Sequence, residues 1–253
     1  MKLNRVMVIA VALVLGALIG LALVNARKER PMARGDARPP INAVPATNSA
    51  VTFSNDIMTM TNREALLPDD PVQLLNYGTE LLHMGRYADA MELYSKALKI
   101  NPEDEEAHFN LGVVYARMGR TNDAIKHYED AIKIFPDYPE AHNNLGRILV
   151  LQGKPADGIQ HFYLALKAQP EYTSAMNNLG WAMAQQGKLV EAVNYFQEAV
   201  RIDTNYVDAR FNLGNALLNL GRKEEAILEL NEVLRQKPGF PPAVTALARA
   251  QRK

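Results

Sequence analysis

The sequence predicts an all-α solenoid of antiparallel helix pairs, preceded by a single membrane helix and a disordered tether. Three observations lead to this prediction. A 34-residue pattern repeats five times without a gap over residues 71–240, glycine returns at fixed places in every copy, and 19 uncharged residues follow one another near the N-terminus. Repetition at a period of roughly 20 to 50 residues indicates stacked units, because each unit can bury its apolar face only against its neighbours.

The first segment, residues 1–24, is predicted to be an N-terminal signal anchor. As a helix, residues 6–24 would span about 28 Å, close to the hydrocarbon core of a bilayer at about 30 Å. A cleaved secretory signal is the alternative, because Lys2 and Arg5 precede the stretch and Val24-Asn25-Ala26 could be a cleavage site. The apolar part of such signals is normally only about 7 to 15 residues long, which favours the anchor.

The charges beside this segment predict the side of the membrane on which the repeats lie. Five Lys and Arg follow the apolar stretch within residues 25–38, whereas Lys2 and Arg5 precede it. The positive-inside rule therefore favours cytoplasmic repeats, on what we expect to be a bacterial inner membrane. The lack of cysteine and the signal-like start favour a periplasmic location instead. Small residues at four-residue spacing suggest a lateral dimer by close helix packing, through Ala12, Gly16 and Gly20.

Two further segments precede the repeats. Residues 25–50 are rich in Pro, Arg, Asn and Ala with little to bury, which is typical of a disordered linker. Residues 51–70 form a lead-in that could be a degenerate capping helix, because Pro68 lies 34 residues before Pro102. Arg63 falls where the pattern calls for a small residue, and this speaks against the capping helix.

Each copy of the pattern predicts two helices, here called the first and the second helix of a repeat. Glycine occupies places eight and fifteen of every copy, alanine or glycine place twenty, and proline place thirty-two in four copies. The later glycine can end the first helix with a left-handed cap, while proline cannot continue the second helix. Prolines followed by an apolar pattern at residues 241–253 predict a C-terminal capping helix. The five copies are residues 71–104, 105–138, 139–172, 173–206 and 207–240.

The residues at these places resemble the tetratricopeptide repeat family. The second copy carries the family pattern in Leu111, Gly112, Tyr115, Ala124, Tyr128, Ala131 and Pro136. Departures from it are Tyr77 at place seven, His108, His142 and Arg210 at place four, and Leu230 with Val233 in the last copy. The resemblance covers about two thirds of the chain. It implies a right-handed solenoid whose first helices face a concave binding groove.

Composition excludes several classes of function. Residues 1–50 contain seven Lys and Arg and two acidic residues, so residues 51–253 contain 21 Lys and Arg and 26 acidic residues. This slightly acidic remainder does not suit nucleic acid. We expect neither an enzyme nor a cofactor, because cysteine is absent, no serine stands in G-x-S-x-G, and residues 180–188 lack the spacing of a phosphate loop. Histidines share two repeat places, as duplication would produce, and no metal site is predicted from His108, His127, His142 and His161.

Asparagine occupies place six of all five copies, as Asn76, Asn110, Asn144, Asn178 and Asn212. Asparagine is a mediocre helix former, so packing alone is a poor reason for it. The row resembles the repeats of O-GlcNAc transferase, whose groove asparagines hold the substrate backbone; we expect no such catalytic domain here, because the match stops at the repeats. Neighbouring first helices lie about 10 Å apart, so one amide would meet about every third residue of an extended peptide. Duplicated, solvated amides without a role are the alternative.

Other side chains predicted to line the groove would supply specificity, and they are Phe109, Arg147, Trp181 and Phe211. Trp181 is the candidate anchor, since aromatic residues dominate interface hot spots; a side chain that fills space between helices is the alternative. The predicted function is therefore a non-catalytic, membrane-tethered adaptor that binds an extended segment of a partner protein. A self-assembling scaffold is the first alternative. A non-catalytic subunit of an enzyme or of a secretion or biogenesis complex is the second.

Overall fold

The computed structural model describes residues 69–251. The chain divides into two units, Met1–Val51 and Thr52–Lys253, and the described residues all belong to the second unit. The predicted membrane helix, the predicted linker and nearly all of the lead-in lie outside the described residues. Within residues 69–251, no helix combines the length and the apolar character needed to cross a bilayer.

The described part of the chain is built of eleven helices and contains no strand, which confirms the prediction of an all-α helix-pair solenoid. The first helices of the pairs are α2 (Pro71–His83), α4 (Glu105–Arg117), α6 (Pro139–Leu151), α8 (Thr173–Gln185) and α10 (Val207–Asn219). The second helices are α3 (Tyr87–Ile100), α5 (Thr121–Ile134), α7 (Pro155–Ala168), α9 (Leu189–Ile202) and α11 (Lys223–Gln236). The last helix, α12 (Pro241–Gln251), begins at the register of a sixth first helix.

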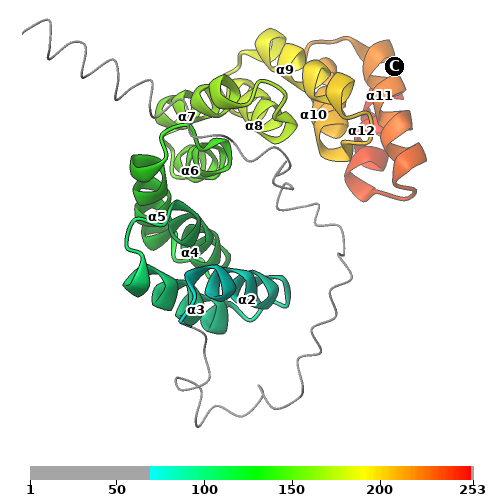
Figure 1. The fold of residues 1–253 in the computed structure, drawn as a ribbon. Helices are drawn as coiled ribbons and strands as arrows, with labels where there is room; N and C mark the ends of the chain where they lie inside the picture. Colours follow the sequence, from blue (N-terminus) through cyan, green and yellow to red (C-terminus); the bar gives the residue numbers. More distant parts are fainter. Residues whose placement is uncertain (1–68, 252–253) are drawn as a thin grey trace, which may run out of the picture. The chain divides into compact units, whose positions relative to one another are not determined.

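The helix pairs follow one another along a curved path (Figure 1). In that view α4, α6, α8 and α10 line the inner side of the curve, and their second helices lie outside. Every first helix has 13 residues and every second helix has 14, so each pair repeats the previous one in register. A side chain at a given place in one repeat therefore has a counterpart in the next.

The turn inside each pair depends on the glycine at place fifteen. All five of these glycines have φ between 73° and 79°, the left-handed region that a Cβ disfavours. At Gly85, for example, the chain reverses while the N–H of Arg86 donates to the carbonyl of Leu81 at 2.8 Å. A Cβ built on these glycines would meet no atom within 4 Å. Backbone conformation, and not space, therefore requires glycine at this place.

The glycine at place eight has the opposite reason. A Cβ on Gly78 would lie 2.5 Å from the ring of Tyr94, and one on Gly112 would lie 2.6 Å from the ring of Tyr128. The large side chain at place 24 of the second helix thus occupies the space that the glycine leaves on the first helix. This contact recurs in every repeat, with the partners Tyr94, Tyr128, Phe162, Phe196 and Leu230.

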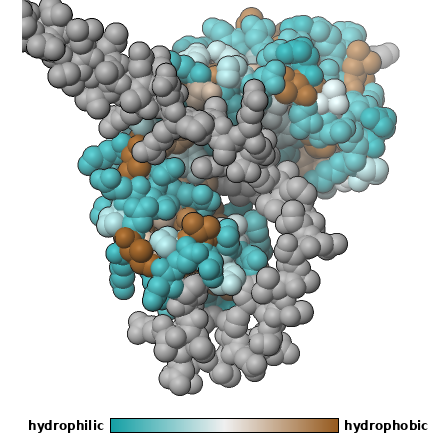
Figure 2. Space-filling view, viewed as in Figure 1, coloured by the Kyte–Doolittle hydropathy of each residue, from teal (hydrophilic) through white to brown (hydrophobic). Residues whose placement is uncertain are grey.

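The core is distributed along the repeats. The buried side chains form five clusters that together extend from α2 to α12. At the end of the series, Leu230 and Val233 of α11 pack with Ala243 and Ala246 of α12, so the last helix covers the apolar face of the fifth repeat. On the face that Figure 2 shows, hydrophobic residues are scattered in small groups among hydrophilic ones.

The third repeat is packed more tightly than the others, and this gives a stability prediction. A Cβ on Gly158 would lie 2.5 Å from the carbonyl oxygen of Gly146 on the facing helix and 2.5 Å from Val150 Cγ2. We expect Gly158→Ala to lower the free energy of unfolding by about 1 to 2 kcal/mol, because overpacking exceeds the gain of up to about 1 kcal/mol in helix propensity. Urea denaturation followed by circular dichroism measures this change.

The expectation is notable because the other four repeats carry alanine at the same place. Gln160→Ala, on an exposed position of α7, is the control and should change the stability by less than about 0.5 kcal/mol. A stabilised Gly158→Ala variant would show that α6 and α7 can separate without loss of packing.

Candidate functional site

The asparagines at place six differ in their exposure. Asn76 is exposed and Asn110 is buried, with only 9% of its surface accessible. Asn144, Asn178 and Asn212 are half-buried. The five asparagines are therefore not equivalent. Only Asn144, Asn178 and Asn212 are partly enclosed by neighbouring side chains and still accessible to solvent.

Two members of the row bond to the preceding repeat. The amide of Asn178 donates to the side-chain oxygen of Asn143 at 2.8 Å, and the amide of Asn212 donates to that of Asn177 at 2.9 Å. Asn143 and Asn177 stand at place five and are buried. These bonds join α6 to α8 and α8 to α10, so they are contacts between repeats.

A tyrosine at place 34 extends each bond into a short network. Asn143 also bonds Tyr172, and Asn177 bonds Tyr206. Burial is the main cause of the raised pKa of both phenols, so each remains a neutral hydrogen-bonding group at neutral pH. Asn178 and Asn212 thus have a role in joining repeats that their poor helix propensity alone did not indicate. The signal that could have revealed this is the doubled asparagine at places five and six.

Asn144 has a weaker tie. Its amide lies 3.5 Å from the hydroxyl of Tyr128, at the limit of a hydrogen bond. A half-buried amide with so long a contact can exchange it for a ligand at little cost. Asn144 is thus the member of the row best placed to bind without weakening the stack.

A hollow of about 300 Å³ brings two predicted site residues together. Trp181 of α8 and Asn212 of α10 both line it. Asn215 and Asn219 continue the same face of α10, while Leu189 and Phe196 of α9 contribute apolar surface. An indole and several amides around one depression can bury an apolar side chain and bond the backbone on either side of it.

The other predicted site residues lie elsewhere. Phe109 is only 6% exposed, because its ring packs between Tyr128 and Tyr138 at centroid distances of 5.8 and 4.9 Å. Phe211 is half-buried and meets Phe240 edge-on at 5.4 Å, beside the start of α12. Arg147 is exposed. In this structure Phe109 is a core residue, whereas Trp181 and Phe211 are half-buried, and of these two Trp181 lines the hollow.

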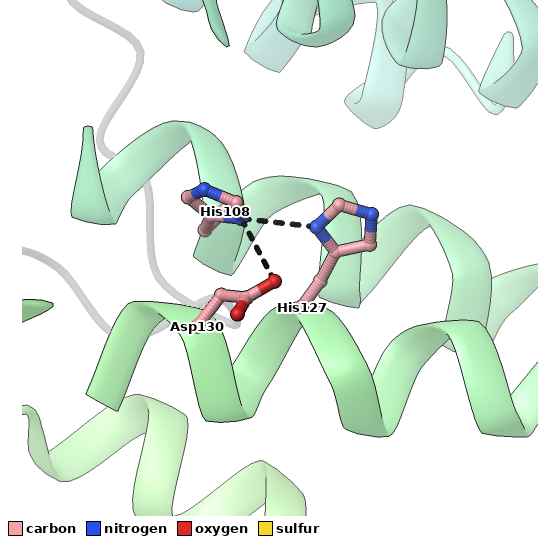
Figure 3. A group of neighbouring side chains, drawn as sticks. All are labelled: His108, His127 and Asp130. Atoms are coloured by element: carbon pink, nitrogen blue, oxygen red, sulfur yellow. Dashed lines mark hydrogen bonds and ion pairs between the residues drawn. The ribbon is translucent and has the colours of Figure 1, made fainter. Parts of the chain in front are cut away.

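A second group of polar residues joins the two helices of single repeats. Places four and 23 face each other, and in the second repeat they carry His108 and His127, whose Nδ1 atoms lie 3.1 Å apart (Figure 3). The third repeat repeats the arrangement with His142 and His161 at 2.9 Å. In the fifth repeat Arg210 and Glu229 form an ion pair there at 2.7 Å.

Burial is the main cause that lowers the pKa of His127, His142 and His161 from its usual value. For His127 and His161 the neighbouring histidine lowers it further, since two adjacent imidazolium ions repel. At neutral pH these three rings are therefore neutral, with one nitrogen that carries a lone pair.

The fold and the site define the class of protein: a helix-pair repeat array that offers side chains from successive helices along one face. Two sequence-family models described as tetratricopeptide repeat match the chain, one over residues 81–148 and 183–250 and the other over residues 137–205. The first model alone matches more than half of the chain. The chain belongs to the tetratricopeptide repeat family, whose members are generally non-catalytic modules that bind protein partners.

Solved structures have the same fold. PilF of Pseudomonas aeruginosa is 21% identical, with a TM-score of 0.67 over 71% of this chain and 82% of PilF. PilW, described as a type IV pilus biogenesis factor, is 23% identical, with a TM-score of 0.64 over 72% and 87%. YrrB, described as having an unusual peptide-binding site, is 23% identical, with a TM-score of 0.57 over 70% and 92%. No curated protein sequence matches the chain significantly.

The bonds between asparagines predict a coupling between repeats. Asn178→Ala should lower the free energy of unfolding by about 1 kcal/mol, because it removes the donor to the buried oxygen of Asn143. In a double-mutant cycle with Asn143→Ala, the coupling energy should be about 0.5 to 1.5 kcal/mol. Urea denaturation of the four proteins measures it.

Asn76→Ala is the matched control, since Asn76 occupies the same place but is exposed. It should change the stability by less than about 0.5 kcal/mol. Additive effects of Asn143→Ala and Asn178→Ala would mean that the bond contributes nothing to stacking.

The pair in the third repeat predicts a dependence of stability on pH. The folded state lowers the pKa of His142 and His161, so the unfolded state binds protons more readily once the pH falls below about 6.5. The contribution of the pair is therefore fully present at neutral pH and is lost as the pH falls from about 7 to about 5. Urea denaturation across this range, in chelator-treated buffer, should show declining midpoints.

The first repeat supplies the design of the control, because it carries the buried residues Leu74 and Leu93 at the same two places. The double variant His142→Leu with His161→Leu should fold and should lose a smaller part of its stability on acidification. An unchanged pH profile in this variant would assign the acid sensitivity to other groups.

Proposed function

We propose that this protein is a non-catalytic adaptor, which binds an extended segment of a partner protein along the inner face of its repeats. The observation that carries the proposal is the hollow between α8, α9 and α10, where Trp181 and Asn212 meet. An aromatic side chain and several side-chain amides border this one depression, and this supports the binding of an apolar side chain together with its flanking backbone.

The residues around this hollow favour a peptide over a small metabolite. Its polar groups are amides, from Gln185, Asn212, Asn215 and Asn219, and none of the described residues that line it is charged. Side-chain amides offer a donor and an acceptor together, as a peptide backbone does. The expected occupant is thus an uncharged or apolar side chain of the partner, flanked by backbone that the amides bind.

Asn144 extends the proposed binding face toward the third repeat. Its contact to Tyr128 is long, whereas Asn178 already bonds Asn143. A peptide would therefore meet an exchangeable amide at Asn144. The amides of Asn178 and Asn212 keep their bonds to the preceding repeat and hold the first helices at a fixed spacing, while the remaining hydrogen-bonding capacity of Asn212 faces the hollow. The description of YrrB as a peptide-binding protein of the same fold supports this direction.

Attachment to a membrane through residues 6–24 is part of the proposal. It rests on the length of the apolar stretch and on the basic residues that flank it. A membrane-anchored adaptor suits a role in an assembly at the cell envelope, as the description of PilW as a pilus biogenesis factor illustrates for one protein of this fold. Alkaline extraction of membranes measures the attachment, since a chain without the anchor would be released.

The experiment that tests the proposal compares partner capture by the full chain and its variants from native membranes. Trp181→Ala should reduce capture about 30-fold or more, because loss of an aromatic hot spot costs about 2 kcal/mol or more. Asn144→Ala should reduce it about fivefold, as expected for one hydrogen bond of about 1 kcal/mol. Quantitative pull-down with mass spectrometry provides the readout.

Asn194→Ala is the control, because Asn194 is an exposed asparagine of α9 that does not line the hollow. It should capture the same partners as the wild type. Circular dichroism must show equal helicity in all variants. Equal capture by Trp181→Ala and Asn194→Ala, with helicity preserved, would exclude this face as the binding site.

A further inference from the structure

Three side chains of the second repeat converge at a point that the proposed adaptor function does not use. His108 comes from α4, while His127 and Asp130 come from α5 (Figure 3). His127 and Asp130 are three residues apart, so they project from the same side of their helix. Nδ1 of His108 lies 3.1 Å from Nδ1 of His127 and 3.7 Å from a carboxylate oxygen of Asp130.

The hydrogen bonds of His108 define which of its nitrogens is free. Nε2 of His108 lies 3.2 Å from the carbonyl oxygen of Pro102. A carbonyl oxygen can only accept, so Nε2 carries the proton and Nδ1 of the neutral ring carries the lone pair. That lone pair points toward His127, as the contact between the two Nδ1 atoms shows. A backbone carbonyl on the remote nitrogen is the arrangement found around histidines that bind metals, because it fixes the tautomer and the ring orientation.

The distances between the donor atoms suit one small cation. The three ligand atoms lie within 4.8 Å of one another. A tetrahedral ion with bonds of about 2.0 to 2.1 Å would hold its ligands about 3.3 Å apart. The two imidazoles are already near this separation, and the half-exposed Asp130, whose side chain is 37% accessible, can complete it by a small rotation.

We propose that His108 Nδ1, His127 Nδ1 and a carboxylate oxygen of Asp130 bind a divalent late transition-metal ion, for which Zn²⁺ is the best fit. Two imidazoles and one carboxylate are ligands that Zn²⁺ prefers, whereas Mg²⁺ and Ca²⁺ prefer oxygen. Water completes the coordination sphere. Among residues 69–251 this is the group of at least three such side chains that meets the spacing of a metal site.

The surroundings fix the ligands in place. The ring of Tyr115 stacks on His127 at a centroid distance of 5.2 Å and an angle of 15°. The guanidinium of Arg120 in turn lies over the Tyr115 ring, at 4.5 Å from its centroid. His108 is 14% exposed at its side chain, and Asp130 opens toward solvent. An ion can therefore enter from the Asp130 side while the two imidazoles stay in position.

The third repeat provides an internal comparison. His142 and His161 reproduce the two imidazoles, and His142 Nε2 again lies near a carbonyl oxygen, that of Pro136, at 2.9 Å. The place of Asp130 is taken by Leu164. With two ligands and no carboxylate, this pair should bind a metal more weakly. The carboxylate thus separates the metal site from a histidine pair that packs the two helices.

Binding would link α4 to α5 within one repeat. The metal stabilises the folded state only, because the three ligands come together only when the helices pack. Unlike the histidine sequence pattern, which repeats, the complete donor set occurs in the second repeat alone among the described residues. The sequence, in which duplication explains the repeated histidines, does not predict this site.

The test uses the full chain, purified without an affinity tag and stripped with a chelator. Titration with Zn²⁺ in a calorimeter should show one saturable site per chain and a raised melting temperature. His127→Asn and Asp130→Leu should each weaken the affinity at least about 10- to 100-fold, the range known for lesser changes around metal ligands. Co²⁺ should give a ligand-field absorption spectrum that both variants lose, and Mg²⁺ should not compete.

His161→Asn is the matched control, because it removes the same residue from the pair without a carboxylate, and it should leave the Zn²⁺ affinity unchanged. Leu164→Asp should create a second site of similar affinity. The proposal is overturned if Zn²⁺ shows no saturable binding, if His127→Asn and Asp130→Leu bind as the wild type does, or if His161→Asn weakens binding as much as His127→Asn. Circular dichroism verifies that each variant keeps its helicity.

Discussion

One contact sets the geometry on which the rest of the array depends: the large side chain at place 24 of each second helix lies against the glycine at place eight of its first helix. The ring of Tyr128 fills the space where a Cβ on Gly112 would stand. The helices approach closely there, and the distance between them then decides which side chains at places four and 23 can meet. The third repeat takes this further, since Gly158 replaces alanine and brings its helix against the carbonyl of Gly146. This packing therefore determines both the distance between the paired histidines and the spacing of the side chains on the inner face.

The sequence predicts the fold well because its strongest signals are local and repeated. A glycine that must adopt φ near 75° and a proline that cannot continue a helix determine where each helix ends, whatever its neighbours do. The candidate site is less predictable, because it depends on contacts between repeats. Phe109 and Trp181 look alike as groove aromatics in the sequence, yet Phe109 is enclosed by Tyr128 and Tyr138 whereas Trp181 borders a hollow. The two stand at different places of the repeat, five and nine, but only the structure shows that place five is the more buried of the two.

The asparagines illustrate a second limit of sequence reasoning. Poor helix propensity at one place of every copy predicts a role in binding, and the structure shows that Asn178 and Asn212 also bond to the preceding repeat. The two roles are compatible. An amide that is fixed by one bond keeps further hydrogen-bonding capacity in a defined direction, and such preorganisation lowers the entropic cost of binding. Within one row, then, some members hold the helices at a constant spacing, and Asn144, with its long contact, remains exchangeable.

Places four and 23 of each repeat form a pair of facing positions, here called the socket, whose side chains differ between repeats while the backbone around them stays the same. Leu74 and Leu93 fill it in the first repeat, two histidines in the second and third, and Arg210 with Glu229 in the fifth. The array therefore separates architecture from chemistry. By substituting these two residues in a chosen repeat, an engineer could introduce an apolar contact, a histidine pair that responds to pH, metal ligands or an ion pair. The same holds in evolution. A single substitution at place four or 23 can change whether one repeat responds to pH or to a metal ion, while the other repeats keep their side chains at these places.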